Sequence, residues 1–191
     1  MDAIQLDSVV GWAAYLSAAA TIGTAITGVL FFVLGERFGR INDIVSVLQM
    51  LFMLPVAVGL YLVARQAGPS VALVVSIVGV LGMLVAALLQ ALLVARVVEY
   101  EQTIGAVLAA GGVIGLWLVL VNSQAWGEAI LPGGLAICGI AAGVGYGLLA
   151  VGFRMGGQEH PLSYAGAGAV LVGYSVWAIW LGYLFASGTL A

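Results

Sequence analysis

The sequence contains no lysine, one histidine and one cysteine, and each scarcity excludes a class of function. With five arginines and a net charge of −3, the chain has no basic surface to neutralise a run of phosphates, so we expect no nucleic-acid partner. His160 alone cannot supply the two histidines of a transmembrane b-type haem, nor a histidine-rich zinc or di-iron site. Cys138 has no second cysteine to pair with and is expected to be a small apolar residue. The sequence therefore predicts no metal and no cofactor.

Charge of either sign is also scarce. Charged residues make up 7% of the chain, against about a quarter of a soluble domain, while 64% of residues are apolar and the mean hydropathy is +1.22. This is the composition of a membrane protein, whose first partner is the lipid bilayer. The N-terminus is acidic and the first apolar run is longer than a signal-peptide core, so we interpret that run as a retained spanning helix.

Long apolar runs, by contrast, are abundant. Six stretches are apolar over the roughly 20 residues that a helix needs to cross a bilayer. They predict transmembrane helices near residues 9–34, 42–64, 70–95, 103–122, 132–153 and 163–186. The connections are short, which leaves no segment to fold outside the membrane. We therefore predict an all-α, polytopic membrane helical bundle in which residues 1–191 form a single transmembrane domain.

The positions of the arginines predict the orientation of the bundle. Arg37, Arg40, Arg96 and Arg154 lie in the first, third and fifth connections, which face one side of a six-span protein, and only Arg65 lies on the other side. Loops rich in arginine stay in the cytoplasm. Both termini are therefore predicted to be extracytoplasmic, in a multi-pass protein of the inner or plasma membrane.

Residues 131–153 are the most glycine-rich of the predicted spans. Gly139, Gly143 and Gly147 recur at intervals of four, so one face of this helix has almost no side chains. Helices in lipid associate through such faces because their backbones can approach closely. We expect this helix at the centre of the bundle, with its bare face against another helix or a ligand. Pro55 lies inside the span at 42–64, where it removes one backbone hydrogen bond and is expected to kink the helix.

Polar side chains inside the spans are few, and each is costly in lipid unless it is satisfied. Gln49 and Gln90 lie within the second and third spans, Tyr146 in the fifth and Trp177 in the sixth. They are interpreted either as hydrogen bonds between helices or, with Pro55 and the three glycines, as the lining of a pocket for a largely apolar ligand. No charged residue falls near the centre of a span, which argues against ion-coupled transport.

The densest charge cluster is Glu36, Arg37, Arg40 and Asp43, between the first two spans. One interpretation is a cytoplasmic turn whose local ion pairs fix the two helices, and the other is a gate or a docking site for a partner. An enzyme acting on lipid is a further possibility, and it requires Glu36, Asp43 and His160 to converge on one face.

Several segments resemble a family of small polytopic bacterial membrane proteins that is grouped as a domain of unknown function. The similar segments are INDIVSVLQMLFMLPVAVGLYLV at 41–63, GLWLVLV at 115–121, LP at 131–132, AGVGYGLLAVGF at 142–153, HPL at 160–162 and VWAIWLG at 176–182. The resemblance implies a bundle of six or slightly more helices in a bacterial inner membrane. It implies no substrate, cofactor or catalytic residue.

Three hypotheses for the function follow from the sequence. The first is a non-enzymatic accessory or structural subunit that packs with itself, as a homo-oligomer, or with membrane partners in a larger complex. The second is the binding or translocation of a small apolar ligand, such as a lipid, quinone or carotenoid, between the second, fifth and sixth helices. The third is an intramembrane enzyme acting on lipid, although no catalytic constellation is present in the sequence.

Overall fold

The computed structural model describes residues 3–35 and 37–190, and nearly all of them are helical. The helices are α1 (Ala3–Leu34), α2 (Arg37–Ala64), α3 (Pro69–Val94), α4 (Tyr100–Gly127), α5 (Gly133–Gly156), α6 (Pro161–Ala169) and α7 (Ser175–Ala186). A 3₁₀ turn, η1 (Gly157–Glu159), follows α5, and a π-helical turn, η2 (Val170–Tyr174), joins α6 to α7. The part of the chain described contains no strand. The predicted all-α fold is confirmed.

Six helical segments, α1 to α5 and the combined α6–η2–α7, are long and apolar enough to cross a membrane, as predicted. They fit an integral, multi-pass membrane protein. The candidate spans within them are 26 to 28 residues long, which corresponds to about 40 Å and exceeds the ~30 Å hydrocarbon core of a bilayer. Three helices extend well past the predicted ends, because α1 begins at Ala3, α2 begins at Arg37 and α4 covers Tyr100–Gly127. Hydropathy marks the apolar middle of a span, whereas the helix continues through polar residues at either end.

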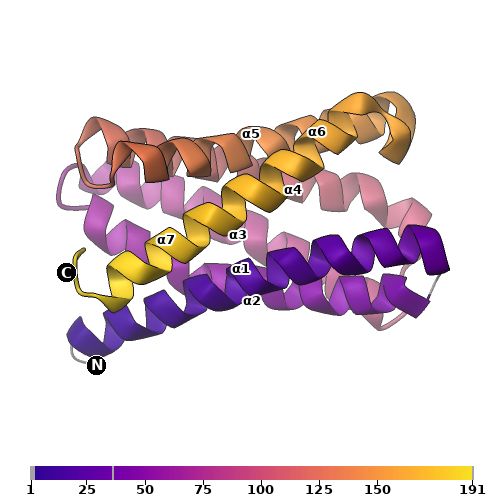
Figure 1. The fold of residues 1–191 in the computed structure, drawn as a ribbon, viewed down its shortest axis with the longest axis horizontal. Helices are drawn as coiled ribbons and strands as arrows, with labels where there is room; N and C mark the ends of the chain where they lie inside the picture. The colour runs from indigo at the N-terminus through magenta and orange to yellow at the C-terminus, as the bar shows by residue number, and fades with distance from the viewer. Residues whose placement is uncertain (1–2, 36, 191) are drawn as a thin grey trace.

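The six spans form a closed ring. Each helix packs on the next one in the sequence, and the ring closes because α7 packs on α1. The two termini therefore lie at the same end of the bundle (Figure 1). A ring of six helices leaves a central space that side chains must fill, and this space contains the candidate site.

The sixth span is divided by its π-helical turn, which is wider than a turn of α-helix. Its first part, α6, packs on α5, whereas α7 packs on α1. Figure 1 shows this span crossing the face of the bundle obliquely, from α5 at one end to α1 at the other. As a result, α1 and α6 diverge at the end of the bundle opposite the termini.

Aromatic side chains fill the middle of the ring. Trp117 and Trp177 meet edge to face with 6.3 Å between ring centroids, and Tyr174 lies 5.4 Å from Trp177. Two hydrogen bonds fix this cluster to neighbouring helices. The Trp177 indole N–H donates to Asn122 Oδ1 at 2.8 Å, and Ser17 Oγ lies 2.8 Å from the Tyr174 hydroxyl. All five side chains are fully buried, so the aromatic cluster closes one end of the central space.

Helices α4 and α5 approach each other through glycine. A Cβ added at Gly143 would lie 2.5 Å from the carbonyl oxygen of Gly115, and one added at Gly115 would lie 2.6 Å from the carbonyl oxygen of Gly143. Gly139 faces the side chain of Asn122 with no room for a Cβ. A Cβ at Gly147, in contrast, would meet nothing within 4 Å. The bare face of α5 is therefore occupied by α4 at its first two glycines and is open at the third.

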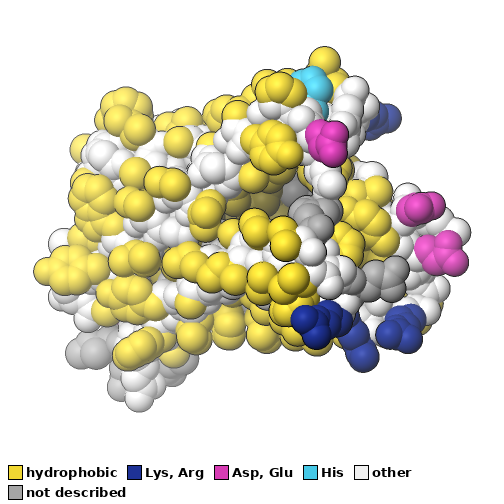
Figure 2. Space-filling view, turned by 45° about the vertical axis from the view of Figure 1, so that its right-hand side comes forward, with side chains coloured by type: hydrophobic (Ala, Val, Ile, Leu, Met, Phe, Trp, Pro, Cys, Tyr) yellow, Lys and Arg dark blue, Asp and Glu magenta, His cyan; other side chains and the backbone are white. Residues whose placement is uncertain are grey.

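Charged side chains gather at the end of the bundle opposite the termini, and the rest of the visible surface is mainly apolar (Figure 2). This end, called the arginine end below, carries Arg37, Arg40, Arg96 and Arg154, whereas Arg65 follows α2 at the other end. The predicted orientation of the bundle in the membrane depends on this unequal distribution of the arginines between its two ends. The assignment of the arginine end to the cytoplasm stays a prediction.

Candidate functional site

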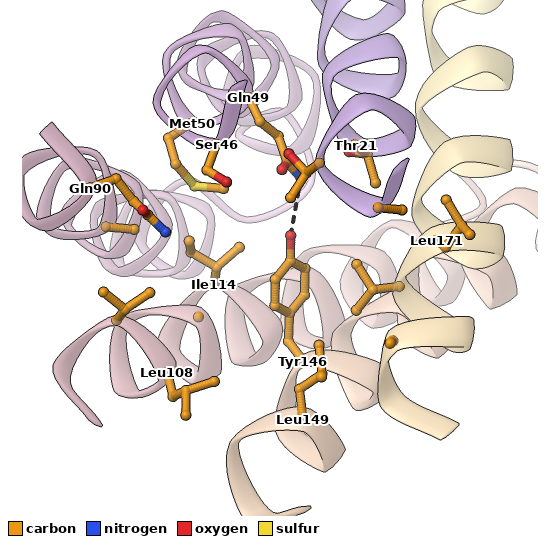
Figure 3. A pocket seen from close by; sticks show the side chains of 17 residues that line it. Thr21, Ser46, Gln49, Met50, Gln90, Leu108, Ile114, Tyr146, Leu149 and Leu171 are labelled. Atoms are coloured by element: carbon orange, nitrogen blue, oxygen red, sulfur yellow. Dashed lines mark hydrogen bonds between the residues drawn. The ribbon is translucent and has the colours of Figure 1, made fainter. Parts of the chain in front are cut away.

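A cavity of about 240 Å³ lies inside the ring, between the aromatic cluster and the arginine end. All six spans line it. Most of its lining is apolar, including Met50, Ala86, Ile114, Leu149 and Leu171 (Figure 3). The volume exceeds that of an apolar cavity of ~150 Å³, which is enough to accept benzene. The cavity is therefore large enough for part of a small organic molecule.

One hydrogen bond crosses the cavity. Gln49 on α2 donates through Nε2 to the hydroxyl of Tyr146 on α5 at 3.2 Å, and Figure 3 shows the two side chains meeting across the open space. Gln49 is only 4% exposed, so this bond satisfies a buried amide group that would otherwise be costly. The Gln49–Tyr146 pair places one amide carbonyl and one phenolic oxygen among apolar neighbours.

Other polar groups that line the cavity have no hydrogen-bond partner among the described residues. These are Gln90 Oε1 on α3 and Thr24 Oγ1 on α1, both of which are shielded from solvent. The Ser46 hydroxyl on α2 also lines the cavity and forms no side-chain hydrogen bond within the described chain. A buried polar atom left unpaired costs about 1–3 kcal/mol. A molecule that carries a donor or an acceptor would satisfy these groups.

The cavity reaches the outer surface between the first and sixth spans. Ala25 on α1 and Ala167 on α6 both line it, and Ala167 is exposed. These are the two segments that diverge where the sixth span leaves α1 for α5. Figure 2 shows a recess in the apolar surface beside the charged end.

The structure brings together three of the predicted ligand-binding residues, Gln49, Gln90 and Tyr146, on the wall of this cavity. The other five do not line it. Gly139 and Gly143 pack against α4, Gly147 is open to the outside, and Trp177 belongs to the aromatic cluster. Pro55 is the last of these five residues, and helix α2 continues through it without interruption.

The hypothesis from the sequence placed the ligand between the second, fifth and sixth spans, but the cavity is lined by all six. Small side chains on α1, α3 and α4, such as Ala25, Ala86 and Gly111, leave the space open from those sides. Sequence reasoning missed Thr21, Thr24 and Ser46. A hydroxyl side chain inside an apolar span could have indicated that these residues line a cavity. Such side chains usually bond to their own helix, as Thr21 does to the Ser17 carbonyl at 2.9 Å, so the indication is weak.

The predicted charge cluster lies around a second, larger cavity of about 790 Å³ at the arginine end. Arg37, Arg40 and Asp43 line it, and Glu36 lies outside the described residues. Within the described chain Arg37, Arg40 and Asp43 form no ion pair. The interpretation as a turn fixed by local ion pairs includes Glu36 and stays a prediction. Arg37 instead lies over the ring of Phe38, 4.9 Å from its centroid.

The residues that a lipid-acting enzyme would need are held in different settings. His160 caps α6, because its Nδ1 accepts a hydrogen bond from the backbone N–H of Leu162 at 3.2 Å. Asp43 lines the cavity at the arginine end, and His160 does not. Among the described residues no group of three or more histidine, cysteine or acidic side chains is placed to hold a metal ion.

Comparisons of this chain with protein-family models, with curated proteins and with solved structures give no match. The resemblance to small bacterial membrane proteins therefore stays a prediction.

Proposed function

We propose that this protein binds a small, mainly apolar molecule in the cavity at the centre of its six-helix ring. The observation that supports this most directly is the Gln49–Tyr146 hydrogen bond, which crosses an otherwise apolar space of about 240 Å³. Ligand sites in proteins combine mostly apolar walls with a few polar groups that fix orientation, and they occur between the helices of bundles.

The unpaired groups around the cavity support the same proposal. Gln90 Oε1 accepts a hydrogen bond and the Thr24 hydroxyl donates or accepts one, so a ligand with one polar end and an apolar body fits this lining. Lipids, quinones and carotenoids with a hydroxyl or carbonyl group belong to this class. The lateral opening at Ala25 and Ala167 gives such a molecule a path from the bilayer.

A leucine in place of Gly111 tests the proposal. Gly111 lines the cavity, and an added Cβ would stand at an ordinary contact distance of 3.5 Å from the Tyr146 ring, so the variant is expected to fold with its side chain in the cavity. The wild-type protein, purified from membranes in mild detergent, is expected to retain a stoichiometric apolar molecule, measured by mass spectrometry of an organic extract. Gly111→Leu is expected to retain about tenfold less, since overpacking costs at least ~1 kcal/mol.

Gly112→Leu is the matched control. It adds the same side chain to the next residue of α4, which does not line the cavity and whose Cβ would meet nothing within 4 Å. It is expected to retain as much of the molecule as the wild type. A wild-type protein that retains no apolar molecule, or equal retention by Gly111→Leu, contradicts the proposal.

A second function, packing as an accessory subunit, is favoured by the outer face of α4. Gly105 and Ala109 are both exposed, and both line a groove of about 400 Å³ between α4 and α5. A Cβ at Gly105 would meet nothing within 4 Å, so the backbone there is open to close approach by another helix. The occupant that we propose for this groove is a second copy of the chain or a helix of a membrane partner.

The association of the protein in detergent tests this second function. Light scattering is expected to give a mass above that of one chain for the wild type. The dissociation constant of the Gly105→Leu/Ala109→Leu variant is expected to be about tenfold higher, because bulky side chains keep the backbones apart. Leu116, which is exposed further along α4 and outside the groove, provides the control substitution Leu116→Ala. A wild type that is a lone monomer without co-purifying protein would rule out this role.

A further inference from the structure

The second cavity, called the arginine pocket below, is lined by positively charged and polar side chains together with apolar ones. Arg37 and Arg40 from α2 line it together with Arg96, which follows α3. Asn42 and Tyr100 add an amide and a phenolic hydroxyl. Its volume of about 790 Å³ is sufficient for a hydrated headgroup.

The charges in this pocket are not balanced by the described chain. Among the described residues that line it, three arginines face one carboxylate, that of Asp43, and none of these arginines forms an ion pair with a described residue. Arg37 and Arg40 also lie in the first turn of α2, where the helix dipole is positive and cationic side chains are unfavourable. An anion in the pocket would relieve this repulsion, and arginine is the side chain best suited to phosphate oxygens.

The arginine pocket and the central cavity lie one above the other along the same helices. On α1 the lining passes from Thr24 in the cavity to Gly28 in the pocket, and on α2 from Ser46 to Asn42. On α3 it passes from Gln90 to Leu93. Each step is about one helical turn, or roughly 5 Å. A molecule that bridges this step would have its polar end at the arginines and its apolar part in the cavity.

We propose that the ligand is a membrane lipid with an anionic phosphate headgroup, held by Arg37, Arg40 and Arg96, and with part of its acyl or isoprenoid chain in the central cavity. This inference rests on the proposed function, since it names the class of molecule that the cavity receives. The lateral opening between α1 and α6 provides the entry for the chain, at the same end of the bundle as the arginines. Asn42 and Tyr100 provide hydrogen bonds for hydroxyl or ester oxygens of the headgroup.

Arg154 separates this proposal from a general attraction of arginines to an anionic membrane surface. It lies at the same end of the bundle but lines the groove between α4 and α5, outside the arginine pocket. A surface effect predicts equal contributions from all four arginines. A headgroup site predicts that Arg154 contributes nothing to selectivity.

The experiment measures lipid retention in detergent. The full chain in dodecyl maltoside is mixed with equal amounts of dioleoyl phosphatidic acid and dioleoyl phosphatidylcholine, which have the same chains, and the lipids that remain after gel filtration are counted by mass spectrometry. Wild type is expected to retain more phosphatidic acid than phosphatidylcholine. In R40Q/R96Q the ratio of the two retained lipids is expected to fall about tenfold. Arg40 and Arg96 are exposed, so the variant is expected to fold, which a thermal melt checks. R154Q is expected to keep the preference.

Three outcomes would overturn the proposal: an unchanged preference in R40Q/R96Q, an equal loss in R154Q, or displacement of phosphatidic acid by inorganic phosphate alone. The last outcome would identify a site for free phosphate. The Gly111→Leu variant distinguishes failure here from failure of the proposed function. If wild type shows no headgroup preference but retains more lipid than Gly111→Leu, the cavity still binds an apolar molecule and only the headgroup assignment is wrong. If the two retain equal lipid, the proposed function itself fails.

Discussion

Replacing Gly143 with valine is expected to destabilise the bundle by about 3 kcal/mol or more. A Cβ at this position would lie 2.5 Å from the carbonyl oxygen of Gly115 and 3.0 Å from the backbone nitrogen of Val119. Both of these are backbone atoms of α4, so no side-chain rotation relieves the contact and the two helices must separate. The midpoint of thermal unfolding in detergent is expected to fall by about 10 °C.

Gly147→Val provides the control for this prediction. It introduces the same side chain on the same helix, four residues further along, where a Cβ would meet nothing within 4 Å. Its unfolding temperature is expected to stay close to that of the wild type. Equal destabilisation by the two valines would show that the cost comes from changing glycine in α5 as such, and not from the contact with α4.

Replacing Asn122 with leucine is expected to destabilise the protein by about 2 kcal/mol, because the buried indole N–H of Trp177 would lose its acceptor. The bond is 2.8 Å long, and both residues are fully buried. Asn122 also donates to the carbonyl of Leu118 on its own helix at 2.8 Å, which fixes the orientation of its amide. Leucine keeps the branched shape of the side chain, but its methyl groups are larger than the amide oxygen and nitrogen that face Gly139, so part of the loss comes from packing.

A double-mutant cycle isolates this bond. The coupling between Asn122→Leu and Trp177→Phe is expected to be about 1 kcal/mol, at the upper part of the range found for hydrogen bonds between membrane helices. Trp117→Phe serves as the control, since the Trp117 indole N–H has no partner in the described chain. Its cycle with Asn122→Leu is expected to be additive within about 0.5 kcal/mol. Additivity in both cycles would contradict a stabilising role for the Asn122–Trp177 bond.

The number and type of the helices were predictable from the sequence because hydrophobicity alone determines which segments enter a membrane. The glycines of α5 show where this reasoning ends. Four residues advance a helix by about 400°, so each step of four turns the glycine by about 40° around the axis, and Gly147 lies about 80° from Gly139. A regular interval therefore does not keep three residues on one contact, and α4 covers only the first two.

The candidate site was predictable only in part. Gln49, Gln90 and Tyr146 were identifiable because polar groups inside apolar spans are rare, and all three line the cavity. The space between them depends on residues that leave no such signal. Gly111 and Ala167 resemble the many other small residues of the chain, and their role follows from which helices face each other, which a single sequence does not encode locally.

The closure of the ring by its last helix also has a consequence for biosynthesis. Membrane helices leave the ribosome in order, and two of the buried polar bonds, Ser17–Tyr174 and Asn122–Trp177, join the first and the fourth span to the sixth. Until residues 161–186 are inserted, Ser17 and Asn122 face lipid or water without these partners, and five helices form an open trough. Assembly of the aromatic cluster therefore waits for the insertion of residues 161–186, on which a closed interior depends.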